Sequence, residues 1–150
     1  MAGSIPSDTW VLSEEIAFRI ASIVNGYANT RMEVWREESR VTGEGYEWVE
    51  GEGASIEVVG EAPVGPVRDW LRANGFRLVD TISNTIGEGE WEVGEKWERV
   101  VHASDGVTII IQVDLVYEVD GRGVERLGSV SVYPVMNTWT SPGIAGAVAS

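Results

Sequence analysis

The chain has 150 residues, a net charge of −13, seven tryptophans, one histidine, one lysine and no cysteine. This length fits one globular domain, and the lack of cysteine excludes a disulfide scaffold, a thiolate metal site and a cysteine nucleophile. The acidity disfavours a nucleic-acid ligand, because a phosphate backbone would be repelled.

The first predicted element is a helix that begins at Ser13. Ser13 can cap the helix, and Glu14 and Glu15 would lie in its first turn, where the helix dipole favours anions. Apolar residues recur at helical spacing from Ile16 onward. Asn25-Gly26 predicts the end of the helix, because glycine tolerates the left-handed conformation of a C-terminal cap.

Beyond this helix the apolar pattern changes to a period of two, which is typical of strands. It predicts strands at 32–35, 46–49 and 54–59, with a glycine-rich hairpin loop at 42–45. A second helix is expected over 66–74, because proline is tolerated in a first turn and Gly75 can end the helix.

The last third of the sequence predicts an antiparallel meander. Its strands are expected at 97–102, 107–119 and 124–135, because Asp-Gly pairs between apolar runs are a strong hairpin signal, and a separate strand is expected at 76–82, directly after the second helix. The most apolar point, Ile109–Ile111, is expected in a central strand. From Thr138 onward the residues are small, so we expect a single domain over 1–137 and a Gly/Ala-rich tail over 138–150.

These elements predict an α+β fold with a largely antiparallel, twisted sheet of about six or seven strands and two helices packed on one face. A strongly curved or barrel-like sheet is the main alternative. The order helix, strand, Gly-Glu-Gly, strand occurs twice, around 43–45 and 87–89. If this repeated order, here called the sequence echo, reflects the structure, two αββ units share one sheet.

The residues that usually perform catalysis are scarce. His102 could act as a general base, but its place in a strand before a hairpin is that of an ordinary strand residue. The sequence has no Gly-x-Ser-x-Gly elbow, no phosphate-binding loop and no EF-hand order of aspartates. We therefore expect no catalytic residue, no metal site and no cofactor. No stretch has the pattern of a signal peptide or a membrane-spanning helix.

The tryptophans allow two interpretations. In a strand such as Tyr46–Val49 or 90–93, Trp48 or Trp91 faces the core if the neighbouring glutamates face water. Alternatively, some tryptophans lie on an exposed face rimmed by carboxylates, which would be a docking site, because tryptophan dominates interface hot spots. Trp139 follows the last predicted strand and is the tryptophan least expected in the core.

The leading functional hypothesis is a non-catalytic, acidic protein-binding module, such as an inhibitor or immunity-type partner of a basic protein. The first alternative is a structural subunit of a larger assembly, such as a phage virion or a secretion apparatus, in which the partners are copies of itself. The second is a small-molecule-binding protein or acid–base enzyme that uses buried carboxylates. Neither nucleic acid nor a membrane is an expected partner.

Two acidic segments, Glu44–Glu57 and Glu88–Glu95, contain half of all glutamates and lie beside glycine-rich turns. We expect them to form one partner-facing edge, because charge near a binding site steers association. The residues expected to contact the partner are Glu44, Glu47, Trp48, Glu50, Glu52, Glu88, Glu90, Trp91, Glu92 and Trp139.

Overall fold

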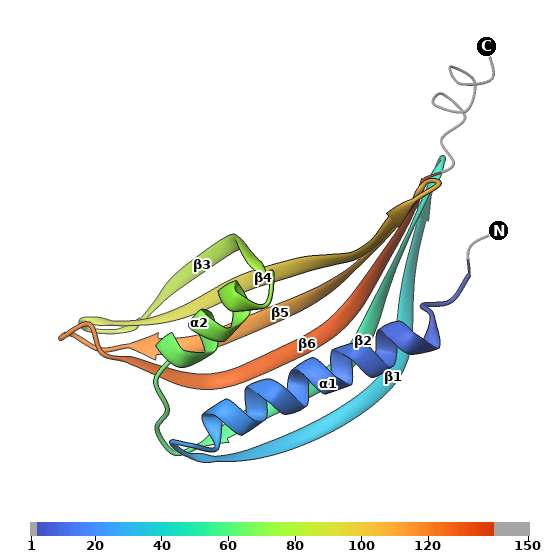
Figure 1. Ribbon diagram of the computed structural model, residues 1–150. Helices are drawn as coiled ribbons and strands as arrows, with labels where there is room; N and C mark the ends of the chain where they lie inside the picture. Colours follow the sequence, from blue (N-terminus) through green and yellow to red (C-terminus); the bar gives the residue numbers. More distant parts are fainter. Residues whose placement is uncertain (1–2, 140–150) are drawn as a thin grey trace.

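A computed structural model, which describes residues 3–139, contains one six-stranded antiparallel sheet with both helices on the same face (Figure 1). The strand order across the sheet is β1-β2-β6-β5-β4-β3. The predicted α+β class and the placement of both helices are confirmed. The elements are α1 (Ser7–Val24), β1 (Asn29–Gly43), β2 (Tyr46–Val59), α2 (Gly65–Ala73), β3 (Arg77–Gly87), β4 (Glu90–Ser104), β5 (Val107–Val119) and β6 (Glu125–Trp139).

The core lies between the helices and the central strands. Alternate residues of β5, including Ile111 and Leu115, point toward the helices and are fully buried. Ile20 of α1 and Leu71 of α2 pack in the same cluster. The apolar run Ile109–Ile111 therefore lies in an inner strand, as predicted.

Helix α1 begins at Ser7, six residues before the predicted cap, so Ser13 is not a cap. Ser13 is buried inside the helix, and its hydroxyl donates to the carbonyl oxygen of Trp10 at 2.9 Å. Trp10 explains the earlier start, because its side chain packs in a second apolar cluster with Val49 and Met136. The helix ends at Val24, as the Asn25-Gly26 pair predicts.

The strands predicted at 46–49 and 54–59 form one strand, β2, so the sheet has six strands. The pairing of β2 with β6 is irregular between Glu50 and Ala54. At Gly53 a Cβ atom would collide with the carbonyl oxygen of Val132, so only glycine allows this close approach of the two strands. Strand β6 continues to Trp139, beyond the predicted domain end at 137, and residues 140–150 of the predicted tail lie outside the described range.

The two αββ units are present in the topology. Each helix is followed by a hairpin, and the hairpins β1–β2 and β3–β4 form opposite sides of the sheet. Strands β6 and β5 lie between them and join the two units into one sheet. The arrangement therefore has the order that the sequence echo predicts.

The tryptophans divide between core and surface. Trp97 is almost fully buried, with 1% of its surface exposed, whereas Trp91 is 41% exposed. The interpretation that Trp91 faces the core is wrong, because β4 extends there beyond the helices, beside a strand β3 in which every residue is exposed. Trp139 is 55% exposed, as expected.

Candidate functional site

The side of the sheet opposite α1 and α2, here called the helix-free face, has no covering element among residues 3–139. Because side chains alternate along a strand, the residues between the core positions of β5 point to this face. Gln112 and Asp114 are two of them, and the strand register places Tyr133 and Ser131 of β6 beside them. Gln112 and Tyr133 are buried even though no helix covers them.

Two hollows open on the helix-free face, one on each side of Asp114. The first, of about 330 Å³, is lined by residues that include Trp35, Glu50, Glu52, Asp114 and Tyr133. The second, of about 240 Å³, contains Asp80, Ile82, Lys96 and Asp114.

Asp114 is held in an unfavourable environment for a carboxylate. The Tyr133 hydroxyl donates to Oδ2 at 2.8 Å, but the buried Oδ1 has no hydrogen-bond partner. Burial raises the pKa of Asp114, and the Glu50 carboxylate raises it further, while the Tyr133 hydrogen bond and the charge of Lys96 offset part of this rise. Asp114, which lines both hollows, therefore has a buried acceptor oxygen without a hydrogen-bond partner.

Glu37 and Glu52 lie directly opposite each other on β1 and β2. A hydrogen bond between the two carboxyl groups raises the pKa of Glu52, and some burial and the negative charge of Glu37 act in the same direction. Like charges directly opposite one another in a sheet are destabilising. A cation bound between the two groups would relieve this repulsion.

Charge is distributed unequally between the two sides of the sheet. On the helix-bearing side, Arg36 bonds Glu14 at 2.8 Å, Arg40 bonds Glu47 at 2.6 Å, and Arg68 bonds Glu95 at 2.7 Å. On the helix-free face, the carboxylates that form no ion pair within residues 3–139 are Glu33, Glu37, Glu50, Glu52, Glu57, Asp80, Glu92, Asp114 and Glu118.

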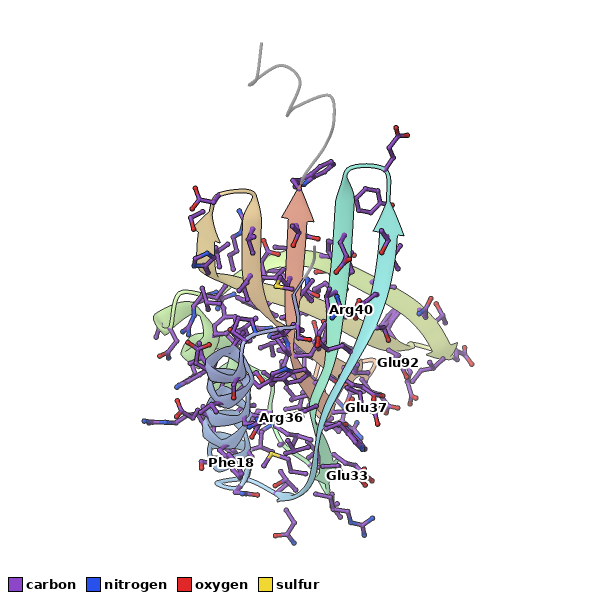
Figure 2. The ribbon with its side chains drawn as sticks, turned by 90° about the vertical axis from the view of Figure 1, so that its right-hand side faces the viewer. Phe18, Glu33, Arg36, Glu37, Arg40 and Glu92 are labelled. Atoms are coloured by element: carbon purple, nitrogen blue, oxygen red, sulfur yellow. The ribbon has the colours of Figure 1, made fainter. Side chains whose placement is uncertain are left out.

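Figure 2 shows this separation from the side. Phe18 and α1 lie to the left of the sheet, and Glu33, Glu37 and Glu92 lie to its right. Cations are present on the helix-free face as well. Arg77 is bonded to Glu98, and Arg126 is bonded to Asp120, whereas Arg31 and Lys96 form no ion pair within residues 3–139. The central part of the face, around Glu50 and Asp114, is acidic.

The two acidic segments predicted to form one edge lie apart. The turn that carries Glu44 joins β1 and β2 on one side of the sheet, whereas the turn that carries Glu88 joins β3 and β4 on the opposite side. Gly89 lies near Gly121 of the β5–β6 turn, at the opposite end of the strands from Trp139. The prediction that the two acidic segments form one edge is therefore wrong.

The individual residues of the predicted site fall into three groups. Trp48, Glu50, Glu52 and Glu92 lie on the helix-free face. Glu47 lies on the helix-bearing side, where it is bonded to Arg40. Trp139, at the end of β6, packs against Tyr46 with ring centroids 5.8 Å apart. The remaining residues, Glu44, Glu88, Glu90 and Trp91, lie at or near hairpin turns.

Among the residues that line the first hollow, Trp35, Asp114 and Tyr133 were not predicted, and neither was Glu37, which lies opposite Glu52. Polar residues between the apolar positions of β5 were the available signal for Asp114. The sequence cannot show which strands are neighbours, so it could not bring β1, β2, β5 and β6 together.

A buried ionic network connects α2 to the sheet. Arg68 donates to Glu95 and to Glu125, both at 2.7 Å, and the hydroxyl of Tyr117 also donates to Glu95. Burial alone would raise the pKa of Glu95, but the bonds from Arg68, Tyr117 and Trp97 outweigh it and lower the pKa. The only buried glutamate within residues 3–139 is thus fully bonded, and its role is to hold α2 in place.

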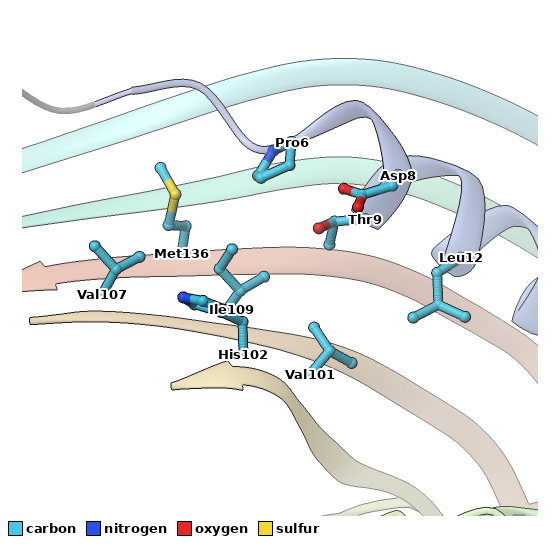
Figure 3. Close-up of a pocket in the computed structure, with 9 residues that line it drawn as sticks. All are labelled: Pro6, Asp8, Thr9, Leu12, Val101, His102, Val107, Ile109 and Met136. Carbon is cyan, nitrogen blue, oxygen red and sulfur yellow. The ribbon is translucent and has the colours of Figure 1, made fainter. Parts of the chain in front are cut away.

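A further hollow, here called the α1 slot, lies on the helix-bearing side and has a volume of about 440 Å³ (Figure 3). Its walls are mainly apolar, and the first turn of α1 contributes Asp8 and Thr9. His102 lies at the slot with its Nε2 3.0 Å from the hydroxyl of Ser104. The buried Glu95 does not line this slot; it is among the residues that line the second hollow.

Comparisons with known proteins returned no match: no family model, no curated protein and no solved structure is significantly similar to the chain. Among the described residues, no group of three or more acidic or histidine side chains is arranged to hold a metal ion. None of the helices in that range has both the length and the apolar character needed to cross a membrane.

Proposed function

We propose that the chain is a non-catalytic binding module that holds an arginine-bearing segment of another protein against its helix-free face, in the manner of an inhibitor or immunity-type partner. The observation that carries the proposal is the charge separation across the sheet. Arginines neutralise carboxylates on the helix-bearing side, while Glu37, Glu50, Glu52 and Asp114 on the other side form no ion pair within residues 3–139.

The first hollow has the chemistry that an arginine side chain requires. A guanidinium group has five donors in a planar fork and forms its strongest hydrogen bonds with carboxylates. Asp114 offers an unpartnered oxygen, and Glu50 lies in the same hollow. Trp35, which is 38% exposed, offers a ring face on which a guanidinium group can stack.

The acidic surface around the hollow supports the same partner. Rim charges speed the encounter with an oppositely charged protein and add little affinity once the complex has formed. Tryptophan and tyrosine anchors at the centre contribute the larger share of binding energy. Trp35 and Tyr133 lie in the hollow, with the glutamates around them.

The test uses a labelled ten-residue peptide of alternating arginine and threonine and compares two double variants. Glu50→Lys with Glu52→Lys changes the hollow, and Glu88→Lys with Glu90→Lys changes the far turn. Each pair shifts the net charge from −13 to −9, since each reversal adds two charges. We expect the first pair to weaken binding at least about tenfold and the second to change it by less than about threefold.

Two further measurements distinguish a specific binding site from a general effect of the negative charge of the protein. Trp35→Ala keeps the charge and should also weaken binding about tenfold, because it removes the stacking surface. In a nitrogen-15 NMR titration, the indole signal of Trp35 should move, and that of the buried Trp97 should not. Equal losses in both charge-reversed pairs, with no effect of Trp35→Ala, would show that the acidity only keeps the protein in solution.

The α1 slot favours a second candidate function, the binding of a small apolar molecule. Its volume of about 440 Å³ falls within the range of ligand pockets, and Ile109 and Met136 give it apolar walls. Val107→Trp should fill the slot. If the function lies here, thermal stabilisation by a panel of small apolar compounds should be present in the wild type and absent from this variant, whereas Trp35→Ala should retain it.

A further inference from the structure

Strand β3 is an edge of the sheet and pairs only with β4 among the described residues. All eleven of its residues are exposed, from Arg77 to Gly87. Ile82, at the middle of the strand, is 60% exposed, and Leu78 and Ile86 are each 46% exposed. A long exposed edge with apolar side chains presents unpaired backbone groups to which another strand can add.

The opposite edge, β1, carries the features that prevent strand addition, namely charged side chains and a break in regular pairing. Its pairing with β2 shifts between Val34 and Glu37. Its charged residues, six of fifteen, are Arg31, Glu33, Arg36, Glu37, Glu38 and Arg40. Of the two sheet edges that residues 3–139 form, only β3 is therefore open to a further strand.

Strand β3 has few of these features. It carries two charges, Arg77 and Asp80, among its eleven residues. Its pairing with β4 is irregular near its ends, after Leu78 and after Thr85, but it is regular from Asp80 to Thr85. This regular stretch contains Thr81, Ile82 and Thr85, residue types that favour strands, together with Asp80, Ser83 and Asn84.

We propose that a second copy of the chain pairs with β3 in antiparallel orientation, with the two-fold axis at Ile82. The two six-stranded sheets then form one sheet of twelve strands. In this register Ile82 faces Ile82 of the second copy, Thr81 faces Ser83, and Asp80 faces Asn84. An antiparallel two-fold pair places the helices of both copies on the same side of the joined sheet.

The charges on β3 favour a second copy over a basic partner. In the proposed register no two like charges face each other, even though each copy has a net charge of −13. Arg77, which is 76% exposed despite its bond to Glu98, would lie beside the Glu88 turn of the second copy at each end of the pair. A basic segment on this edge would find one acidic residue, Asp80. The inference does not depend on the proposed function, which concerns the helix-free face.

The first experiment measures the mass in solution by sedimentation velocity at protein concentrations from about 1 to about 100 μM, a range that covers weak and strong dimers. We expect the mass to double from the 16.3 kDa of one chain as the concentration rises. Ile82→Lys should keep the chain monomeric, because two lysines would face each other at the axis. Val41→Lys, on the protected edge β1, is the matched control and should still dimerise.

A cross-linking experiment tests the register. The chain has no cysteine, so Ile82→Cys introduces a single thiol. Directly opposed residues in antiparallel strands have Cα atoms about 4.5–5.5 Å apart, which suits a disulfide. Ile82→Cys should form a covalent dimer on mild oxidation, and Val34→Cys should not.

Two outcomes would overturn the inference. One is a wild-type mass that stays at one chain at the highest concentration. The other is a dimer that persists unchanged in Ile82→Lys and fails to cross-link through Ile82→Cys. Circular dichroism of Ile82→Lys establishes that the variant is folded, which is expected because the side chain of Ile82 is exposed.

Discussion

Glu37 and Glu52 lie directly opposite each other on β1 and β2, on the side of the sheet that faces away from both helices, and the nearby Glu37 carboxyl group raises the pKa of Glu52. Ordinarily such a cross-strand position holds opposite charges. The repulsion is a cost in the free protein that a bound cation removes. Binding of a basic segment should therefore be linked to the protonation of this pair.

The linkage predicts that affinity for the arginine peptide depends on pH. The pKa of Glu52 is raised in the free protein and should fall when a cation is bound, so binding releases protons. Affinity should decrease as the pH is lowered through the raised pKa of Glu52, and Glu52→Gln should flatten this dependence. Calorimetric titrations between about pH 4 and 7, which span the usual range for glutamate and above, measure the effect. An equally steep dependence in Glu52→Gln would remove this pair from the binding site.

Asp114→Asn should stabilise the free protein at pH 7. Because burial raises the pKa of Asp114 in the folded state, ionisation of this group lowers stability as the pH rises through that pKa. The neutral amide avoids this cost, and we expect a gain of about 1 kcal/mol in the free energy of unfolding. Urea titrations should show the gain shrinking with falling pH and vanishing below about pH 4, where aspartate is protonated in the unfolded chain as well. A loss of stability at pH 7 would mean that the charge is structurally required.

Arg68→Leu should destabilise the fold by about 3–5 kcal/mol at pH 7, because it leaves the buried Glu95 carboxylate without its cation. The lowered pKa of Glu95 means that its contribution is present above the unfolded pKa of about 4.3 and is lost as the pH falls through its folded pKa. Chemical denaturation at pH 7 and pH 3 should therefore show a smaller difference from wild type at the lower pH.

The control for Arg68 is Arg19→Leu, an exposed position on α1 that should change stability by less than about 0.5 kcal/mol. The double variant Arg68→Leu with Glu95→Leu should recover part of the loss, because no buried charge remains. Equal losses in the single and double variants would show that packing of the Arg68 side chain, and not its charge, holds α2.

Gly53→Ala should cost about 1–3 kcal/mol, because a Cβ atom there would collide with the backbone of β6. The matched control is Gly94→Ala, in the inner strand β4, where no atom lies within 4 Å of an added Cβ. That change should be neutral or slightly stabilising. Thermal denaturation of both variants measures the difference, and a neutral Gly53→Ala would show that β2 and β6 can separate locally without cost.

Periodicity predicted the elements of this fold well. A period of two marked the strands, and Asp-Gly and Asn-Gly pairs marked where the chain turns. The start of α1 was missed because Trp10 and Ile5 extend the helix by packing into a cluster that includes Val49, a contact distant in sequence. The strand β2 was divided in two because Gly51 and Gly53 suggest a break, whereas in the sheet they allow close packing against β6.

The candidate site could be predicted only in part. Glu50, Glu52 and Trp48 were found from the density of glutamate and tryptophan in one segment. Asp114 and Tyr133 were not, because the relevance of a polar residue in an apolar strand depends on which face is covered by helices. That information lies in the strand order, in which β6, the last strand of the sequence, is inserted beside β2.

This strand order also constrains how the chain can fold during synthesis. The hairpins β1–β2 and β3–β4 can each form as soon as they leave the ribosome, since their strands are adjacent in sequence. The two hairpins become part of one sheet only when β5 has paired with β4, and β6 has paired with both β5 and β2. A nascent chain that stops before Glu125 would expose the open sides of both hairpins, so chaperone capture should be strongest just before the final strand emerges.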